Sequence, residues 1–176
     1  MPSSIHDLFH EEQRFTQKWL WIIIGGSALP VSLFLIYMVY ARTVLNEPVG
    51  DPNQSDALLF LLVTVFFLLD FLIILAFRHV RLETVVTREN LSVQFTWLGK
   101  EKVPIADIAS ATVREYHPIR EYGGWGLRMG PSGKAYNVRG NMGVQITRKN
   151  GKTFLIGSQR AEELGAVLGR LLEEGS

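Results

Sequence analysis

The segment Ala57–Phe77 constrains the fold more than any other part of the chain, because it is an apolar run with a single charged residue. At about 1.5 Å of rise per residue it would form a helix roughly 31 Å long, which matches the hydrocarbon core of a bilayer. A second apolar run, Trp19–Ala41, has aromatic residues toward both of its ends, as membrane helices have at the two interfaces. The sequence therefore predicts two transmembrane helices, 19–41 and 57–77, joined by a polar loop, 42–56.

Basic residues are distributed unevenly around the two apolar runs. The loop has one of them, Arg42, together with three acidic residues. The five on the opposite flanks are Arg14, Lys18, Arg78, Arg81 and Arg88. Because Lys and Arg are enriched on the cytoplasmic side of membrane helices, this bias predicts an extracytoplasmic loop and both termini in the cytoplasm.

Residues 1–18 precede the first apolar run and contain both apolar and charged side chains. In a helix, Ile5, Leu8, Phe9 and Phe15 can share one face, and the acidic residues can take the other. We therefore expect an amphipathic helix that lies at the membrane interface.

Asp70 is the charged residue inside the second apolar run, at a depth similar to that of Ser27 in the first. Intramembrane carboxylates are costly and normally contact a polar partner. Gly25, Gly26 and Ser27 form a patch of small residues that allows two helices to approach closely. We expect Asp70 to hydrogen-bond Ser27 or an equivalent group. This hydrogen bond would either stabilise the hairpin itself or join the chain to a neighbouring subunit or to the transmembrane helix of a partner.

From Val80 onward the apolar periodicity changes to two, which is typical of β-strands. The expected strands are Arg81–Thr87, Leu91–Trp97, Lys102–Ile105, Ile108–Tyr116, Gly126–Met129, Ala135–Val138, Gly143–Arg148 and Thr153–Gly157. An amphipathic helix over Arg160–Glu174 follows them. The sequence thus predicts an α+β membrane protein. Its domain 78–176 is expected to be a pleckstrin-homology-like barrel of about seven antiparallel strands capped by the C-terminal helix.

Several strings of residues make the chain similar to a known group. They are Glu12–Phe15 with Trp19–Trp21, Ile119–Arg128, Ala135–Val138, Gly140–Val144, and Ile156–Arg160 with Glu162–Leu164. Together with the two apolar runs, they resemble the bacterial membrane-anchored pleckstrin-homology-like proteins, and within these an uncharacterised two-span group. The resemblance implies a binding platform rather than an enzyme, and a tendency to form oligomers.

The segment Ile119–Arg128 combines glycine, tryptophan and arginine in an unusual way. The candidate binding residues of this loop and its surroundings are Arg120, Tyr122, Gly123, Gly124, Trp125, Arg128 and Arg139. Trp and Arg are enriched at interface hot spots, and Arg binds carboxylate or phosphate groups bidentately. Alternatively, Trp125 fills the barrel and the glycines form a bulge or tight corner.

Composition excludes several classes of function. The chain has no Cys, which excludes disulfide scaffolds and thiol chemistry. We find no motif for catalysis, a metal, another cofactor or nucleic acid.

From Arg78 to Arg160 there are 14 Lys and Arg against 6 Asp and Glu, a net charge of +8. Asp70 with its small-residue patch, and the segment with Trp125 and its arginines, lead us to expect binding to copies of the chain or to another membrane protein. The alternatives are binding of anionic lipid headgroups and a role as accessory subunit of a membrane enzyme or transporter.

Overall fold

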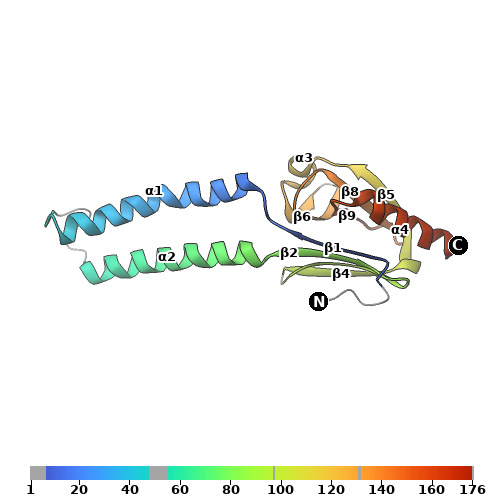
Figure 1. The fold of residues 1–176 in the computed structure, drawn as a ribbon, viewed down its shortest axis with the longest axis horizontal. Coiled ribbons are helices and arrows are strands. Elements are labelled where there is room, and N and C mark those ends of the chain that lie inside the picture. The colour runs from blue at the N-terminus through green and yellow to red at the C-terminus, as the bar shows by residue number, and fades with distance from the viewer. Residues whose placement is uncertain (1–6, 48–54, 97, 131, 176) are drawn as a thin grey trace. The chain divides into compact units, whose positions relative to one another are not determined.

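The computed structural model describes residues 7–47, 55–96, 98–130 and 132–175. The chain divides into two units (Figure 1). One unit, Thr16–Arg78, contains two long helices. The other unit combines Met1–Phe15 with His79–Ser176 and contains two β-sheets and the C-terminal helix. The helical unit is therefore an insertion in the β-rich domain, between its first two strands.

The helices of the first unit are α1 (Lys18–Thr43) and α2 (Asp56–His79). Both are long and apolar enough to cross a membrane, which agrees with the sequence prediction. Many of their large apolar side chains are exposed, including Ile22 at 71% and Leu61 at 58%. So much exposed apolar surface is unusual in a soluble protein. Residues 48–54 of the predicted loop 42–56 lie outside the described residues.

The first sheet of the β-rich domain has four antiparallel strands in the order β1-β2-β3-β4. The strands are β1 (Phe9–Arg14), β2 (Arg81–Val86), β3 (Asn90–Phe95) and β4 (Gly99–Pro104). Alternate residues of β2 and β3 are buried, as the period-two pattern predicts. The turn at Arg88–Asn90 joins β2 to β3 as the sequence indicates.

β1 differs from the amphipathic helix that the sequence predicts over 1–18. Residues 1–6 lie outside the described part, but Phe9–Arg14 is a strand that pairs with β2 along its whole length. The inward residues Phe9, Glu11 and Gln13 are all buried, at 2, 7 and 4% exposure. Two of the three are polar, so the hydrophobic pattern does not reveal the strand.

The second sheet has five strands in the order β5-β8-β9-β7-β6. They are β5 (Ile108–Glu115), β6 (Gly126–Gly130), β7 (Gly133–Asn137), β8 (Met142–Arg148) and β9 (Thr153–Gly157). A short 3-10 helix, Ile105–Asp107, precedes β5, and a short helix, α3 (Pro118–Tyr122), follows it. β7 and β9 run parallel, so the expectation of an all-antiparallel arrangement is wrong for this pair.

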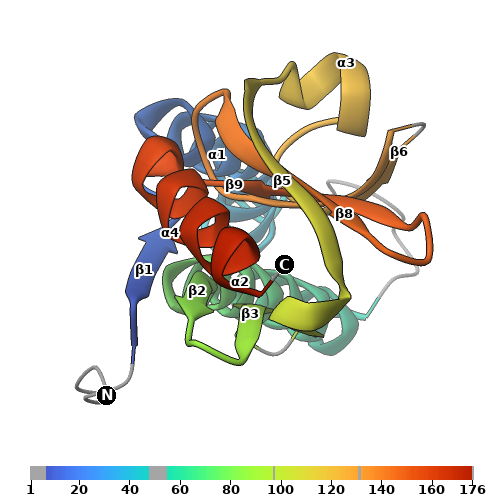
Figure 2. The same cartoon turned by 90° about the vertical axis from the view of Figure 1, so that its right-hand side faces the viewer.

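The core lies between the two sheets and under α4 (Ala161–Glu174). Leu164 and Leu168 of α4 are fully buried, and the helix packs against β5 and β8 (Figure 2). The predicted C-terminal helix is therefore confirmed. The two sheets are hydrogen-bonded separately and do not form a closed barrel, which corrects the barrel expected from the sequence. β4 and β5 are linked through the 3-10 helix instead of pairing with each other.

Candidate functional site

β1 is fastened to the loop that precedes α4 by a buried cluster of hydrogen bonds. The Glu11 carboxylate accepts from Ser158 Oγ at 2.6 Å and from the Gln159 backbone N–H at 2.9 Å. Two residues along β1, Gln13 Nε2 donates to the Gly157 carbonyl at 2.8 Å. These bonds pair the Glu11 carboxylate and the Gln13 amide N–H, which would otherwise be costly to bury. They hold β1 in the sheet although two polar side chains face inward.

Arg160 adds a second layer of contacts to this cluster. Its Nη1 donates to the His10 carbonyl at 3.0 Å, and its guanidinium lies 4.9 Å from the centre of the Phe9 ring. Arg160 also pairs with Glu163 in the first turn of α4. The sequence strings that include Gln13 and Arg160 therefore meet in space. Sequence reasoning missed this contact, because only the pairing of β1 with β2 brings the strings together.

The glycine-rich segment after α3 forms a tight connection into β6. Gly123 has φ 73° and ends α3 in the left-handed conformation, and Gly124 and Gly126 also have positive φ values. Residues with a Cβ rarely adopt such angles, which explains the glycines. Tyr122 is buried at 3% exposure and belongs to a small core cluster with Tyr116. Tyr122, one of the predicted binding residues, is therefore part of the core.

Arg114 of β5 holds α3 in place through hydrogen bonds. The sequence analysis did not identify Arg114 as a candidate residue. Its Nη2 lies 2.8 Å from Glu121 Oε2, 3.1 Å from Tyr122 Oη and 3.1 Å from Gln145 Oε1. The hydrogen bond from Arg114 lowers the pKa of Glu121, and burial raises the pKa of Tyr116 to about 12. The segment is therefore held by charge-assisted hydrogen bonds.

Trp125 is half-buried, so it neither fills the core nor stands free of the domain. Its Nε1 donates to the Gly140 carbonyl at 3.1 Å, and Arg128 Nε donates to the Trp125 carbonyl at 2.9 Å. Arg120 and Arg139, like Arg128, are exposed. Arg128 of β6 therefore contacts Trp125, which directly precedes this strand.

Two exposed apolar side chains belong to the same region. Ile119 of α3 is 68% exposed and Met129 of β6 is 82% exposed. α3 and β6 are in contact, since a Cβ at Gly130 would overlap the Glu121 carbonyl oxygen. The residues of this region that are exposed or half-buried, Ile119, Arg120, Trp125, Arg128 and Met129, are together called the α3–β6 surface below.

The predicted intramembrane contact of Asp70 stays a prediction. Ser27 Oγ donates to the Ile24 carbonyl of its own helix at 3.0 Å. A Cβ at Gly25 or Gly26 would have no neighbour within 4 Å, so both glycines leave space for an approaching helix. Within the described residues, Asp70 has no hydrogen-bond partner.

A second cluster of charged groups joins the two sheets. Glu101 of β4 accepts from Lys134 Nζ at 3.0 Å and from Tyr136 Oη at 3.1 Å, and it also pairs with Arg148. Burial raises the pKa of Glu101, but the hydrogen bonds from Lys134, Arg148 and Tyr136 outweigh it and lower the pKa overall. Since Glu101 of one sheet is paired with Lys134, Tyr136 and Arg148 of the other, the cluster has a structural role.

The described residues contain no group of three or more His, Asp or Glu side chains that could hold a metal ion. A search for related proteins adds no assignment. No protein-family model matches the sequence, and no curated protein matches it. The function must therefore be argued from the geometry of the chain itself.

Proposed function

We propose that this chain is a non-enzymatic, membrane-anchored interaction module. Its helix hairpin would hold a pleckstrin-homology-like domain at the cytoplasmic face of the inner membrane. There the domain would bind another copy of the chain or another membrane protein. The proposal includes membership of the bacterial two-span group that the sequence resembles.

The observation that carries the proposal is the insertion of the hairpin between two paired strands. β1 ends at Arg14 and β2 begins at Arg81, and these two residues lie opposite each other. A segment that leaves the domain and returns to the neighbouring strand must begin and end on one side of a bilayer. Two membrane crossings meet this condition, which supports a hairpin with both of its ends on the cytoplasmic side.

The α3–β6 surface is the proposed contact with a protein partner. It combines two exposed apolar residues, Ile119 and Met129, each of which is next in sequence to an exposed arginine, Arg120 or Arg128. Met, Arg and aromatic residues are enriched at protein interfaces, and this surface has all three kinds. The bracing of α3 by Arg114 supports binding further, because a rigid surface loses little conformational entropy on association.

The test measures the native mass of the full-length protein after gentle extraction and identifies the proteins that co-purify with it. We expect an oligomer or a stoichiometric complex for the unmodified chain. The double variant Ile119→Ser/Met129→Ser should be monomeric. The matched variant Leu8→Ser/Leu98→Ser changes two other exposed apolar residues and should retain the assembly. A monomeric unmodified protein, or a double variant that still assembles, would overturn the proposal.

A further inference from the structure

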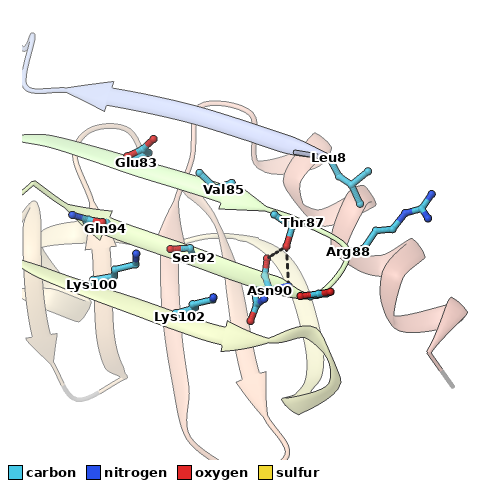
Figure 3. Close-up of a pocket in the computed structure, with 11 residues that line it drawn as sticks. Leu8, Glu83, Val85, Thr87, Arg88, Asn90, Ser92, Gln94, Lys100 and Lys102 are labelled. Atoms are coloured by element: carbon cyan, nitrogen blue, oxygen red, sulfur yellow. Dashed lines mark hydrogen bonds between the residues drawn. The ribbon is translucent and has the colours of Figure 1, made fainter. Parts of the chain in front are cut away.

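A hollow of about 1000 Å³ lies on the solvent face of the β1–β4 sheet (Figure 3). Its floor is made of side chains that alternate with the core residues of the same strands, such as Ser92 and Gln94 of β3. Lys102 and Lys100 of β4 lie directly opposite these two residues in the strand register. The hollow therefore has a polar floor with two ammonium groups along one side.

Three cations line this hollow, Arg88, Lys100 and Lys102. In the part of the chain that the structure describes, Lys100, Lys102 and Arg88 belong to no ion pair. By contrast, Lys134 on the other sheet is paired with Glu101. Two carboxylates also border the hollow, but Glu83 Oε1 lies 3.2 Å from His10 Nε2, and Glu89 is exposed in the turn between β2 and β3. The β4 side of the hollow is thus available to an anion.

We propose that this hollow binds a soluble phosphate-bearing small molecule of about the size of a sugar phosphate. Lys100 and Lys102 are two residues apart on a strand, so their backbone attachment points are about 6.6 Å apart. They can contact two phosphate groups or two oxygens of one. Ser92, Gln94 and Asn90 offer hydrogen bonds to hydroxyl groups. The volume is at the upper end of the range for small-molecule sites.

The lining favours a soluble ligand over a lipid headgroup. Among the described lining residues, Leu8 and Val85 are the only ones with wholly apolar side chains. Attachment to a lipid surface combines charge attraction with inserted apolar side chains, and this hollow offers almost none. The proposal does not depend on the proposed interaction module, because the hollow and the α3–β6 surface belong to different sheets.

The experiment is amine footprinting of the full-length protein in phosphatidylcholine nanodiscs, with acetylation of each lysine measured by mass spectrometry. Fructose 1,6-bisphosphate is the probe and fructose is its uncharged control. We expect the bisphosphate to reduce acetylation of Lys100 and Lys102 at least about threefold, because occupancy removes the free form by mass action. Lys149 and Lys152, near the turn between β8 and β9, should be unaffected.

A second arm replaces phosphatidylcholine with phosphatidylglycerol and omits the probe. Protection of Lys100 and Lys102 in this arm alone would identify a lipid headgroup as the occupant and overturn the proposal. Equal protection of Lys149 and Lys152 by the bisphosphate would show non-specific charge attraction and also overturn it. The proposal would also be overturned if the bisphosphate did not protect Lys100 and Lys102 from acetylation. In calorimetry, the variant K100Q/K102Q should lose binding of the bisphosphate, and K149Q/K152Q should retain it.

Discussion

Arg14 and Arg81 lie opposite each other at the paired ends of β1 and β2, although the whole helix hairpin separates them in the chain. Glu12 contacts both guanidinium groups, with Oε1 2.7 Å from Arg14 Nη2 and Oε2 3.2 Å from Arg81 Nη1. The hydrogen bond from Arg14 lowers the pKa of Glu12. One carboxylate thus bridges two like charges at the place where the chain leaves and re-enters the domain.

The pairing of β1 with β2 predicts a specific disulfide. The chain has no Cys, so the variant Glu12→Cys/Glu83→Cys has a single possible pair within one chain. These residues are direct partners, whose Cβ atoms are about 4.5–5.5 Å apart in such pairs. We expect mild oxidation of the full-length protein to produce an intramolecular disulfide, read by non-reducing electrophoresis and peptide mass.

The control for this prediction is Glu12→Cys/Gln94→Cys. Gln94 is the partner of Glu83 on β3, so it is two strand spacings, roughly 9.6 Å, from Glu12 and beyond the reach of a disulfide. Equal oxidation of the two variants would contradict the register. A disulfide that forms only between chains would instead indicate that β1 is exchanged between copies.

The buried Glu11 cluster predicts a large difference between two adjacent glutamates. Glu11→Ala removes the acceptor of Ser158 Oγ and of the Gln159 N–H, and should cost about 2–3 kcal/mol of the free energy of unfolding. Glu12→Ala removes only exposed ion pairs and should cost less than about 1 kcal/mol. Thermal unfolding of the full-length protein in detergent measures both. If the two variants lost similar amounts of unfolding free energy, the hydrogen bonds of Glu11 would not be what holds β1 in place.

The packing of α4 predicts opposite effects for two of its glycines. A Cβ at Gly165 would overlap Val113 Cγ2 of β5, whereas a Cβ at Gly169 has no neighbour within 4 Å. Gly169→Ala should therefore stabilise the protein by about 0.5–1 kcal/mol through helix propensity. Gly165→Ala should lower its melting temperature, because β-branched Val113 has little freedom to move. Equal shifts in the two variants would contradict the packing of α4 on β5.

The paired carboxylates predict how stability depends on pH. The pKa values of Glu101 and Glu121 are lowered in the folded domain, so their stabilisation is present above the ordinary value of 4.5 and is lost as pH falls through the folded values. Unfolding titrations between pH 7 and pH 3 should show this loss. The slope should be smaller for Glu101→Gln than for the unmodified protein. An unchanged slope for Glu101→Gln would contradict the role of Glu101.

Hydrophobic periodicity alone was enough to predict the strands and the helix whose buried residues are apolar. Strands such as β2 and β9, with apolar alternation or a short apolar run, and the stripe of α4 were predicted nearly to their ends. β1 was missed because the inward Glu11 and Gln13 are polar and form their hydrogen bonds with Ser158, Gln159 and Gly157, which are distant in sequence. A polar residue with buried long-range partners resembles a surface residue in the sequence.

The structure around the predicted binding segment, Ile119–Arg128, also depends on contacts between residues that are distant in the sequence. The glycines and Trp125 were identified from composition, but Arg114, which holds α3 in place, is an ordinary strand residue in the sequence. The parallel pairing of β7 with β9 is also non-local, since β8 lies between them in the chain. No short-range pattern indicates such a pairing.

The most direct test of the account measures on which side of the membrane three positions lie. Single-cysteine variants Glu12→Cys, Asn46→Cys and Lys152→Cys can be treated in intact cells with a thiol reagent that does not cross the membrane. Asn46 follows α1, and the other two residues belong to the β-rich domain. We predict labelling of Asn46→Cys in intact cells, and labelling of Glu12→Cys and Lys152→Cys only after permeabilisation. Equal reactivity of all three variants in intact cells, or opposite sides for Glu12→Cys and Lys152→Cys, would contradict a membrane hairpin inserted into the domain.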